Sequence, residues 1–208
     1  NAENKAIHVV SACATQNGLI LGQLKVEDKS NEIKAIPALL KMIDVAGCTI
    51  TIDAMGCQKE IAGEILKQEG NYVLSLKGNQ KTLYESVKEF FEESRKKLFS
   101  TIKIDSYETI EKDHGRIETR RYYITDNIAW LDDYKWPGLK SIGCVESIRE
   151  IKEKITCEQR YYLSSLEATA VIFAEAVRRH WAIENCLHWS LDVTFNEDKS
   201  RVRTDNAP

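Results

Sequence analysis

The sequence contains few prolines and no long apolar run. Three prolines and ten glycines in 208 residues argue against long disordered linkers. No apolar stretch approaches the roughly 20 residues that a membrane-spanning helix needs, and the first residues do not have the pattern of a signal peptide. We therefore expect one sizeable globular core, with room for a small insertion and with no membrane partner.

Cysteine pairs and an excess of positive charge are also absent. The six cysteines are scattered, and no two of them form a CxxC pair. This argues against a zinc ribbon and favours buried, reduced thiols, which predict a cytoplasmic location. The formal net charge of −3 does not indicate a general nucleic-acid binder, so any DNA contact has to use local basic patches.

The chain does contain a regular alternation of short strands and amphipathic helices. Its first half predicts strands at 6–13, 19–26, 48–52 and 72–76, the first two paired as a hairpin. It also predicts helices at 31–45, 59–69 and 83–99, of which Gly47 ends the first and Gly70 the second. This order indicates a mixed α/β sheet with covering helices. Runs typical of strands follow at 101–125, 139–151 and 159–163, and 167–191 is the longest helical pattern.

One predicted strand ends directly in a carboxylate. Residues 48–52 are rich in β-branched side chains, and Asp53 follows at once, before the tight exit Ala54-Met55-Gly56. Ligands meet side chains at the carboxyl ends of strands in open α/β sheets, so Asp53 is a candidate metal ligand. Asp is also a favoured N-cap residue, so capping of the next helix is the simpler alternative. This segment alone leaves both open.

The last helical pattern carries three polar side chains on one face. His180, Glu184 and His188 are spaced by four residues, which places them one above the other. A carboxylate among apolar neighbours is costly to bury alone, so Glu184 has to be paired, exposed or bound to a metal. A solvated polar stripe is one alternative. A zinc site built by the two histidines and Glu184 is another, although the spacing is not HExxH.

A further alternative joins Asp53 with Glu184. Oxygen ligands from separate elements, with no thiolates, suit Mg²⁺ or Mn²⁺. Two such ions can clamp the attacking and leaving oxygens of a phosphodiester displacement. This pair therefore indicates metal-dependent phosphodiester chemistry.

Six stretches carry a resemblance to a known family. They lie at 5–11, 51–58, 73–80, 114–120, 179–189 and 191–198, and include Thr-Ile-Asp-Ala-Met-Gly-Cys-Gln at 51–58 and Arg-His-Trp-Ala-Ile-Glu-Asn-Cys-Leu-His-Trp at 179–189. In this fixed order they resemble the DDE transposases of bacterial insertion sequences, in the branch of H-repeat-associated proteins. The resemblance covers nearly the whole chain. It implies a ribonuclease-H-like mixed sheet with flanking helices and a β-rich insertion before the last catalytic helix.

The resemblance also implies domain boundaries and a catalytic site. Residues 1–100 would form the first part of the core without its first strand, 101–165 the insertion, and 166–208 the last core helix and a C-terminal segment. Asp53 resembles the family's second catalytic aspartate and Glu184 its catalytic glutamate, which together would bind Mg²⁺ or Mn²⁺, two ions in the complete site. The family's first aspartate precedes the strand at 6–13, so we expect this chain to lack one third of its metal site.

The resemblance implies that the partner is double-stranded DNA, both as transposon ends and as target. It also implies a homodimer in the DNA complex and association with the bacterial nucleoid. The expected DNA contacts follow the strand at 72–76, surround the hairpin turn at His114, and flank the last helix: Lys77, Asn79, Gln80, His114, Arg116, Arg120, Arg179, Asn185, His188 and Arg201. Arginine can contact phosphate in a bidentate manner. For the hairpin, surface ion pairs of Glu118 with Arg116 or Arg120 are the alternative.

Three functions follow from these patterns. The first is a metal-dependent polynucleotidyl transferase that cuts transposon ends and transfers strands. The second is a DNA-binding or assembly fragment without catalysis, because a carboxylate is missing. The third is a small-molecule hydrolase that uses a His/Glu metal site on the last helix.

Overall fold

A computed structural model describes residues 8–26, 32–97, 102–113, 115–152 and 154–183. The described residues fall into two compact units. The first contains the described parts of 8–44 together with 178–183, and the second is Val45–Val177. Each unit is described below by itself.

The first unit contains a hairpin and a short helix. Strands β1 (His8–Ala14) and β2 (Leu19–Val26) pair antiparallel in a two-stranded sheet, which confirms the predicted hairpin. Gly18, in the turn between them, has a φ of 64°, a left-handed value that glycine adopts without strain. Helix α1 (Glu32–Leu40) lies close to β2, since a Cβ added to Gly22 would be 3.0 Å from Leu39 Cδ1.

Helix α1 is shorter than its sequence pattern predicts. The apolar periodicity extends to Val45, but the helix ends at Leu40. Beyond it the backbone tightens, because the Met42 N–H donates to the Leu39 carbonyl at 3.0 Å, three residues back. Pro37, inside the helix, supplies no N–H and weakens its last turn. The predicted end at Gly47 was therefore wrong.

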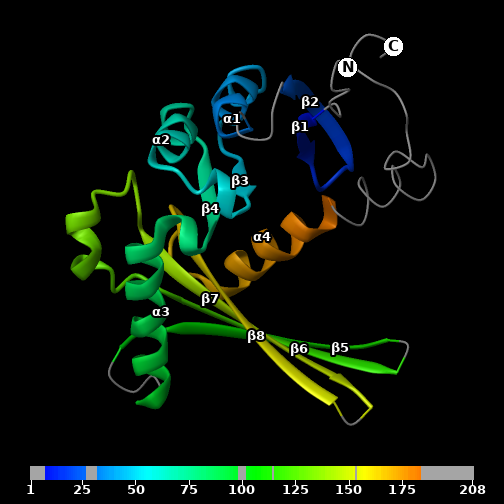
Figure 1. Ribbon diagram of the computed structural model, residues 1–208, viewed down its shortest axis with the longest axis vertical. Helices are drawn as coiled ribbons and strands as arrows, with labels where there is room; N and C mark the ends of the chain where they lie inside the picture. The colour runs from blue at the N-terminus through cyan, green and yellow to red at the C-terminus, as the bar shows by residue number, and fades with distance from the viewer. Residues whose placement is uncertain (1–7, 27–31, 98–101, 114, 153, 184–208) are drawn as a thin grey trace, which may run out of the picture. The chain divides into compact units, whose positions relative to one another are not determined.

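The second unit is built on a six-stranded mixed sheet (Figure 1). Its strands are β3 (Thr49–Ile52), β4 (Asn71–Leu76), β5 (Asp105–Asp113), β6 (Arg116–Thr125), β7 (Ser141–Ile151) and β8 (Lys154–Ser164). Their order across the sheet is β3-β4-β8-β7-β6-β5. Strands β3 and β4 are parallel, and the other neighbours are antiparallel.

Helices cover both faces of this sheet. The α-helices are α2 (Lys59–Lys67), α3 (Lys81–Lys96) and α4 (Ala170–Ile183), and the short 3-10 helices are η2 (Ala54–Gly56), η3 (Gly78–Gln80) and η4 (Ala129–Tyr134). Phe91 of α3 packs on Tyr161 of β8, and Phe173 of α4 packs on the adjacent Tyr162. Successive strand residues point to opposite faces, so α3 and α4 lie on opposite sides. The predicted α/β class, a mixed sheet with flanking helices, is confirmed and is consistent with a ribonuclease-H-like core.

The end of α2 differs from the predicted glycine stop. The helix ends at Lys67, and the residue with left-handed φ (58°) is Glu69, not Gly70. Gly70 has a different role, because a Cβ there would lie 3.1 Å from both Ile65 Cγ2 and the Val45 carbonyl oxygen. The glycine is thus required by close packing at the start of β4 and not by its backbone angle.

The strands of the 101–165 region continue the sheet that β3 and β4 begin. Strand β8 pairs with β4 from Tyr161 to Ser164, and the other half of β8 extends away from that contact. Strand β8 begins at Lys154, five residues before the predicted start at Gln159. The domain boundaries near 100 and 165 stay a prediction. None of the described helices is long and apolar enough to span a membrane.

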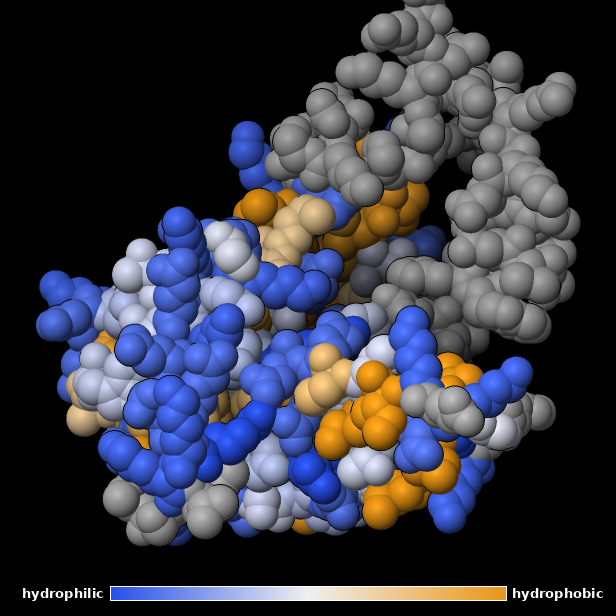
Figure 2. Space-filling view, turned by 60° about the horizontal axis from the view of Figure 1, so that its bottom comes forward, coloured by the Kyte–Doolittle hydropathy of each residue, from blue (hydrophilic) through white to orange (hydrophobic). Residues whose placement is uncertain are grey.

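The outer ends of β5 to β8 carry an apolar face. The strand register places Ile110, Ile117, Ile148 and Ile155 on one side of the sheet. Ile110 and Ile155 are 59% and 67% exposed, and Figure 2 shows apolar side chains gathered over this part of the surface. At these ends the opposite side carries Glu118, Arg120 and Arg149, whereas farther along the strands the isoleucine side carries Arg121 and Glu146.

Packing between α4 and the sheet predicts an effect of adding one methyl group. A Cβ at Gly143 would lie 2.4 Å from Cζ of Phe173, which is fully buried. We expect Gly143→Ala to lower the free energy of unfolding by about 1–3 kcal/mol. Gly63→Ala is the matched control, because nothing lies within 4 Å of the added carbon and Gly63 is inside α2.

In that position alanine should raise the free energy of unfolding by about 0.5–1 kcal/mol through helix propensity. Urea unfolding of both variants provides the measurement. Equal effects of the two substitutions would contradict the packing of α4 on β7 described above.

Candidate functional site

Asp53 lies where β3 ends and η2 begins. Its side chain is exposed, and Oδ1 accepts the Met55 N–H at 3.1 Å and the Gly56 N–H at 3.5 Å. Asp53 is therefore an N-cap, as the simpler alternative proposed, but of the 3-10 turn and not of α2. The turn thus fixes Oδ1, and no described residue donates a hydrogen bond to Oδ2.

The loop after β4 reaches the same place. Because β3 and β4 are parallel and Ile52 is paired with Leu74, their carboxyl ends lie at one edge of the sheet. Asn79 Nδ2 donates to the Ala54 carbonyl, and Gln80 Nε2 donates to the Cys57 carbonyl at 3.1 Å. The structure thus brings Asn79 and Gln80 to the Asp53 turn, whereas Lys77 is exposed at the end of β4.

In the hairpin that was predicted to bind DNA, Arg116 and Arg120 form ion pairs with Glu118, which was the alternative interpretation. Glu118, with a side chain only 8% exposed, lies 2.6 Å from Arg120 and 3.7 Å from both Arg116 and Arg149. Arg120 is also 2.9 Å from Glu111. Both predicted arginines are thus engaged within the sheet, and their role in DNA binding stays a prediction. His114 lies outside the described residues.

The last helix is described only as far as Ile183. Arg179 and His180 are within it, and the His180 ring meets the Trp181 ring edge to face at a centroid distance of 5.4 Å. The other predicted residues of this region lie outside the described part: Glu184, Asn185, His188 and Arg201. The approach of Asp53 to Glu184 and the zinc alternative therefore stay predictions.

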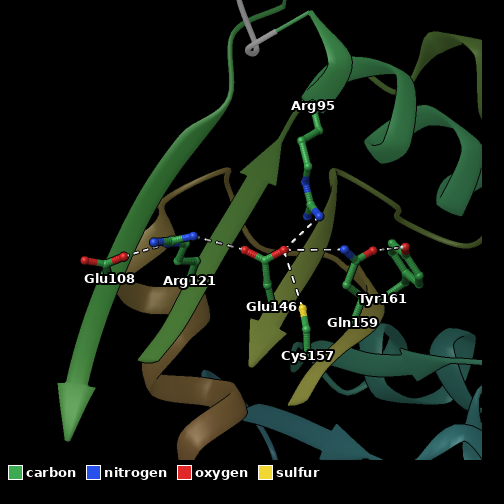
Figure 3. Close-up of polar contacts among 7 residues, drawn as sticks. All are labelled: Arg95, Glu108, Arg121, Glu146, Cys157, Gln159 and Tyr161. Atoms are coloured by element: carbon green, nitrogen blue, oxygen red, sulfur yellow. Dashed lines mark hydrogen bonds and ion pairs between the residues drawn. The ribbon is translucent and has the colours of Figure 1, made fainter. Parts of the chain in front are cut away.

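A buried carboxylate in the sheet was missed from the sequence. Glu146 of β7 lies 2.8 Å from Arg95 of α3 and 3.4 Å from Arg121 of β6, and it accepts a hydrogen bond from Gln159 at 3.4 Å (Figure 3). The register aligns Arg121, Glu146 and Gln159 in one row across three strands. Only the register reveals this row, because the three residues are far apart in the sequence.

The side chains of this row have a structural role. Cys157 Sγ lies 3.9 Å from Glu146, and desolvation, followed by the nearby Glu146 charge, raises the pKa of the Cys157 thiol. A protonated thiol is a poor nucleophile, so the raised pKa disfavours attack by Cys157. The ion pair between Arg95 and Glu146 instead connects α3 to the sheet. The described residues contain no group of three or more His, Cys, Asp or Glu side chains arranged to hold a metal ion.

Comparisons with known proteins agree with the resemblance. The family model described as "Transposase DDE domain" matches residues 1–207. A protein of Escherichia coli O157:H7 named "Putative transposase YncI" is 47% identical over 207 residues, covering 97% of this chain and 52% of the relative. The "H repeat-associated putative transposase YhhI" of Escherichia coli K12 is 46% identical over 208 residues, covering 97% of this chain and 54% of the relative.

A third relative comes from another organism. An "Uncharacterized protein in dhlA 3'region" of Xanthobacter autotrophicus is 44% identical over 167 residues, which cover 77% of this chain and 54% of the relative. The chain thus spans about half the length of the curated relatives it matches.

The Glu146 row predicts a large cost of truncation. In Glu146→Ala, Arg95 and Gln159 lose a partly buried acceptor, so we expect a loss of about 2 kcal/mol in the free energy of unfolding. Glu93→Ala is the control on the same helix as Arg95, since the Glu93–Lys96 pair is exposed and should contribute almost nothing. Urea unfolding compares them, and equal losses would show that Glu146 does not stabilise the sheet.

Burial of Cys57 beside the Asp53 turn predicts a dependence on alkaline pH. Desolvation raises the pKa of this thiol from 9.0 to about 12 in the folded chain. Above about pH 9 the unfolded state loses the proton that the folded state keeps, so stability should fall by about 1.4 kcal/mol per pH unit for this group. Below pH 9 the thiol is protonated in both states and has no effect on the slope.

Cys57→Ala should therefore show a shallower decline of unfolding free energy between about pH 9 and pH 11 than the unsubstituted chain. Cys48→Ala is the control, because Cys48 is exposed. Parallel slopes for the Cys57 variant and the unsubstituted chain would contradict the burial of this thiol.

Proposed function

The chain belongs to the DDE transposase family, and we propose from this that it takes part in metal-dependent cleavage and joining of phosphodiester bonds at transposon ends. The single observation that best supports the proposal is the Asp53 carboxylate. It stands at the carboxyl end of β3, an edge strand of the described sheet, with Oδ1 fixed by two backbone N–H groups and Oδ2 without a described partner. A ligand carboxylate needs this combination of fixed orientation and one available oxygen.

The carboxylate of Asp53 is chemically suited to bind a divalent metal ion. Members of the DDE family normally use divalent metals, and a hard, exposed carboxylate oxygen is the type of ligand that Mg²⁺ and Mn²⁺ prefer. We propose that Asp53 and Glu184 are ligands of these ions. Two bound ions would stabilise negative charge on the attacking and leaving oxygens of the phosphodiester.

DNA is the proposed partner, in keeping with the family. Lys77 is exposed at the sheet edge where Asp53 lies, so its ammonium group can approach a phosphate close to the scissile bond. Arg116 and Arg120 would have to exchange carboxylates for phosphates, because both are paired with Glu118. We further propose a homodimer in the DNA complex, association with the nucleoid, and DNA contacts by His114, Arg179, Asn185, His188 and Arg201.

Nicking of a DNA substrate in Mn²⁺ by the intact protein tests the proposal. Asp53→Asn and Glu184→Gln should each lower the nicking rate by more than about 100-fold, since loss of a ligand should exceed the roughly 10- to 100-fold cost of losing an outer-shell partner. Glu60→Gln is the control, because Glu60 is an exposed carboxylate in the first turn of α2.

The outcomes separate two candidate functions. Nicking at the full rate in both substituted proteins would contradict the proposed roles of Asp53 and Glu184. An unsubstituted protein that binds DNA in Mn²⁺ without nicking it would instead favour the non-catalytic DNA-binding or assembly role.

A further inference from the structure

We propose that Asn79 and Gln80 are positioning residues for the Asp53 carboxylate and not DNA contacts. The proposal rests on the proposed function, because it assigns these amides to the site that Asp53 supplies. It replaces the expectation that both side chains face the nucleic acid. The observations that support it are hydrogen bonds between the loop after β4 and the turn after β3.

The Asp53 turn is a three-residue 3-10 helix with short-range hydrogen bonds. The Cys57 N–H donates to the Ala54 carbonyl at 3.2 Å, and Asp53 accepts from Met55 and Gly56. Gln58 donates from its N–H to the Gly56 carbonyl at 2.9 Å and from Nε2 to the Met55 carbonyl at 3.3 Å. Short 3-10 turns have poorer hydrogen-bond geometry than α-helices. Contacts from outside the turn can therefore help to fix the direction of the two N–H groups that donate to Oδ1.

Asn79 and Gln80 supply this support from the neighbouring strand exit. Asn79 Nδ2 donates to the Ala54 carbonyl at the start of the turn, and Gln80 Nε2 donates to the Cys57 carbonyl at its end. Gln80 Nε2 also lies 3.3 Å from Gln58 Oε1. The two amides thus hold both ends of the segment whose N–H groups orient Asp53.

The use of amides explains why these contacts do not depend on DNA. Each amide donates to a backbone carbonyl, which is an acceptor present in the protein at all times. Cys57 and Gly56 are buried, so the Cys57 carbonyl would lose its partner at a largely enclosed position. Asn79 is exposed like Lys77, but its Nδ2 already donates to the Ala54 carbonyl, so it has less capacity to contact a phosphate.

Three measurements on the intact protein test the proposal: amide hydrogen exchange at Met55 and Gly56, Mn²⁺ affinity by electron paramagnetic resonance, and DNA affinity in EDTA. Asn79→Ala and Gln80→Ala should each speed exchange at both amides and weaken Mn²⁺ binding by about 10-fold, the lower end of the effect of outer-shell partners. DNA affinity without metal should not change. Lys81→Ala is the control, because Lys81 is exposed, adjoins the same loop and makes no described contact with the turn.

The two proposals fail in different ways. Loss of DNA affinity in EDTA, with exchange at Met55 and Gly56 unchanged, would make Asn79 and Gln80 DNA contacts and overturn the inference. If Asp53→Asn abolished Mn²⁺ binding while both amide variants kept it, the inference would fail and the proposed function would stand. If Asp53→Asn bound Mn²⁺ as tightly as the unsubstituted protein, the proposed function would fail. If one of the two amide variants does not fold, the same measurements on the other variant test the proposal.

Discussion

The candidate site depends on the parallel pairing of β3 with β4. Parallel neighbours end at the same edge of a sheet, and the pairing of Ile52 with Leu74 fixes how far apart their exits are. Asp53 and the loop at 77–80 are therefore neighbours although more than twenty residues separate them in the chain. A one-residue slip of β4 would turn its side chains to the opposite face and move Asn79 and Gln80 away from the turn.

Capping and metal binding are compatible uses of one carboxylate. Asp53 uses Oδ1 for the Met55 and Gly56 N–H groups, and Oδ2 accepts no hydrogen bond from a described residue. The sequence left these two interpretations of the residue open as alternatives. The geometry accommodates both, since capping fixes the orientation that a ligand oxygen requires. The turn, the amides that support it and the exposed oxygen form one local unit.

Sequence reasoning succeeded where the determinants are local. The hairpin of β1 and β2, the strand before Asp53 and the position of the 77–80 loop were all predicted, because β-branched runs and turn residues signal them directly. Sequence reasoning failed where tertiary packing determines where an element ends or why a residue is needed. Helix α1 ends early despite its apolar periodicity, and Gly70 serves close contact with Val45. The Glu146 row depends on a strand register that no sequence pattern displays.

The central claim is that Asp53 and Glu184 bind the same divalent ion. Anomalous diffraction from crystals of the intact protein soaked in Mn²⁺ tests it most directly, because the signal locates the metal independently of activity. The account predicts a manganese peak coordinated by Asp53 Oδ2 and by a carboxylate oxygen of Glu184, at the edge where β3 and β4 end. A manganese site that includes only one of these carboxylates, or that lies at the histidines of the last helix, would contradict it.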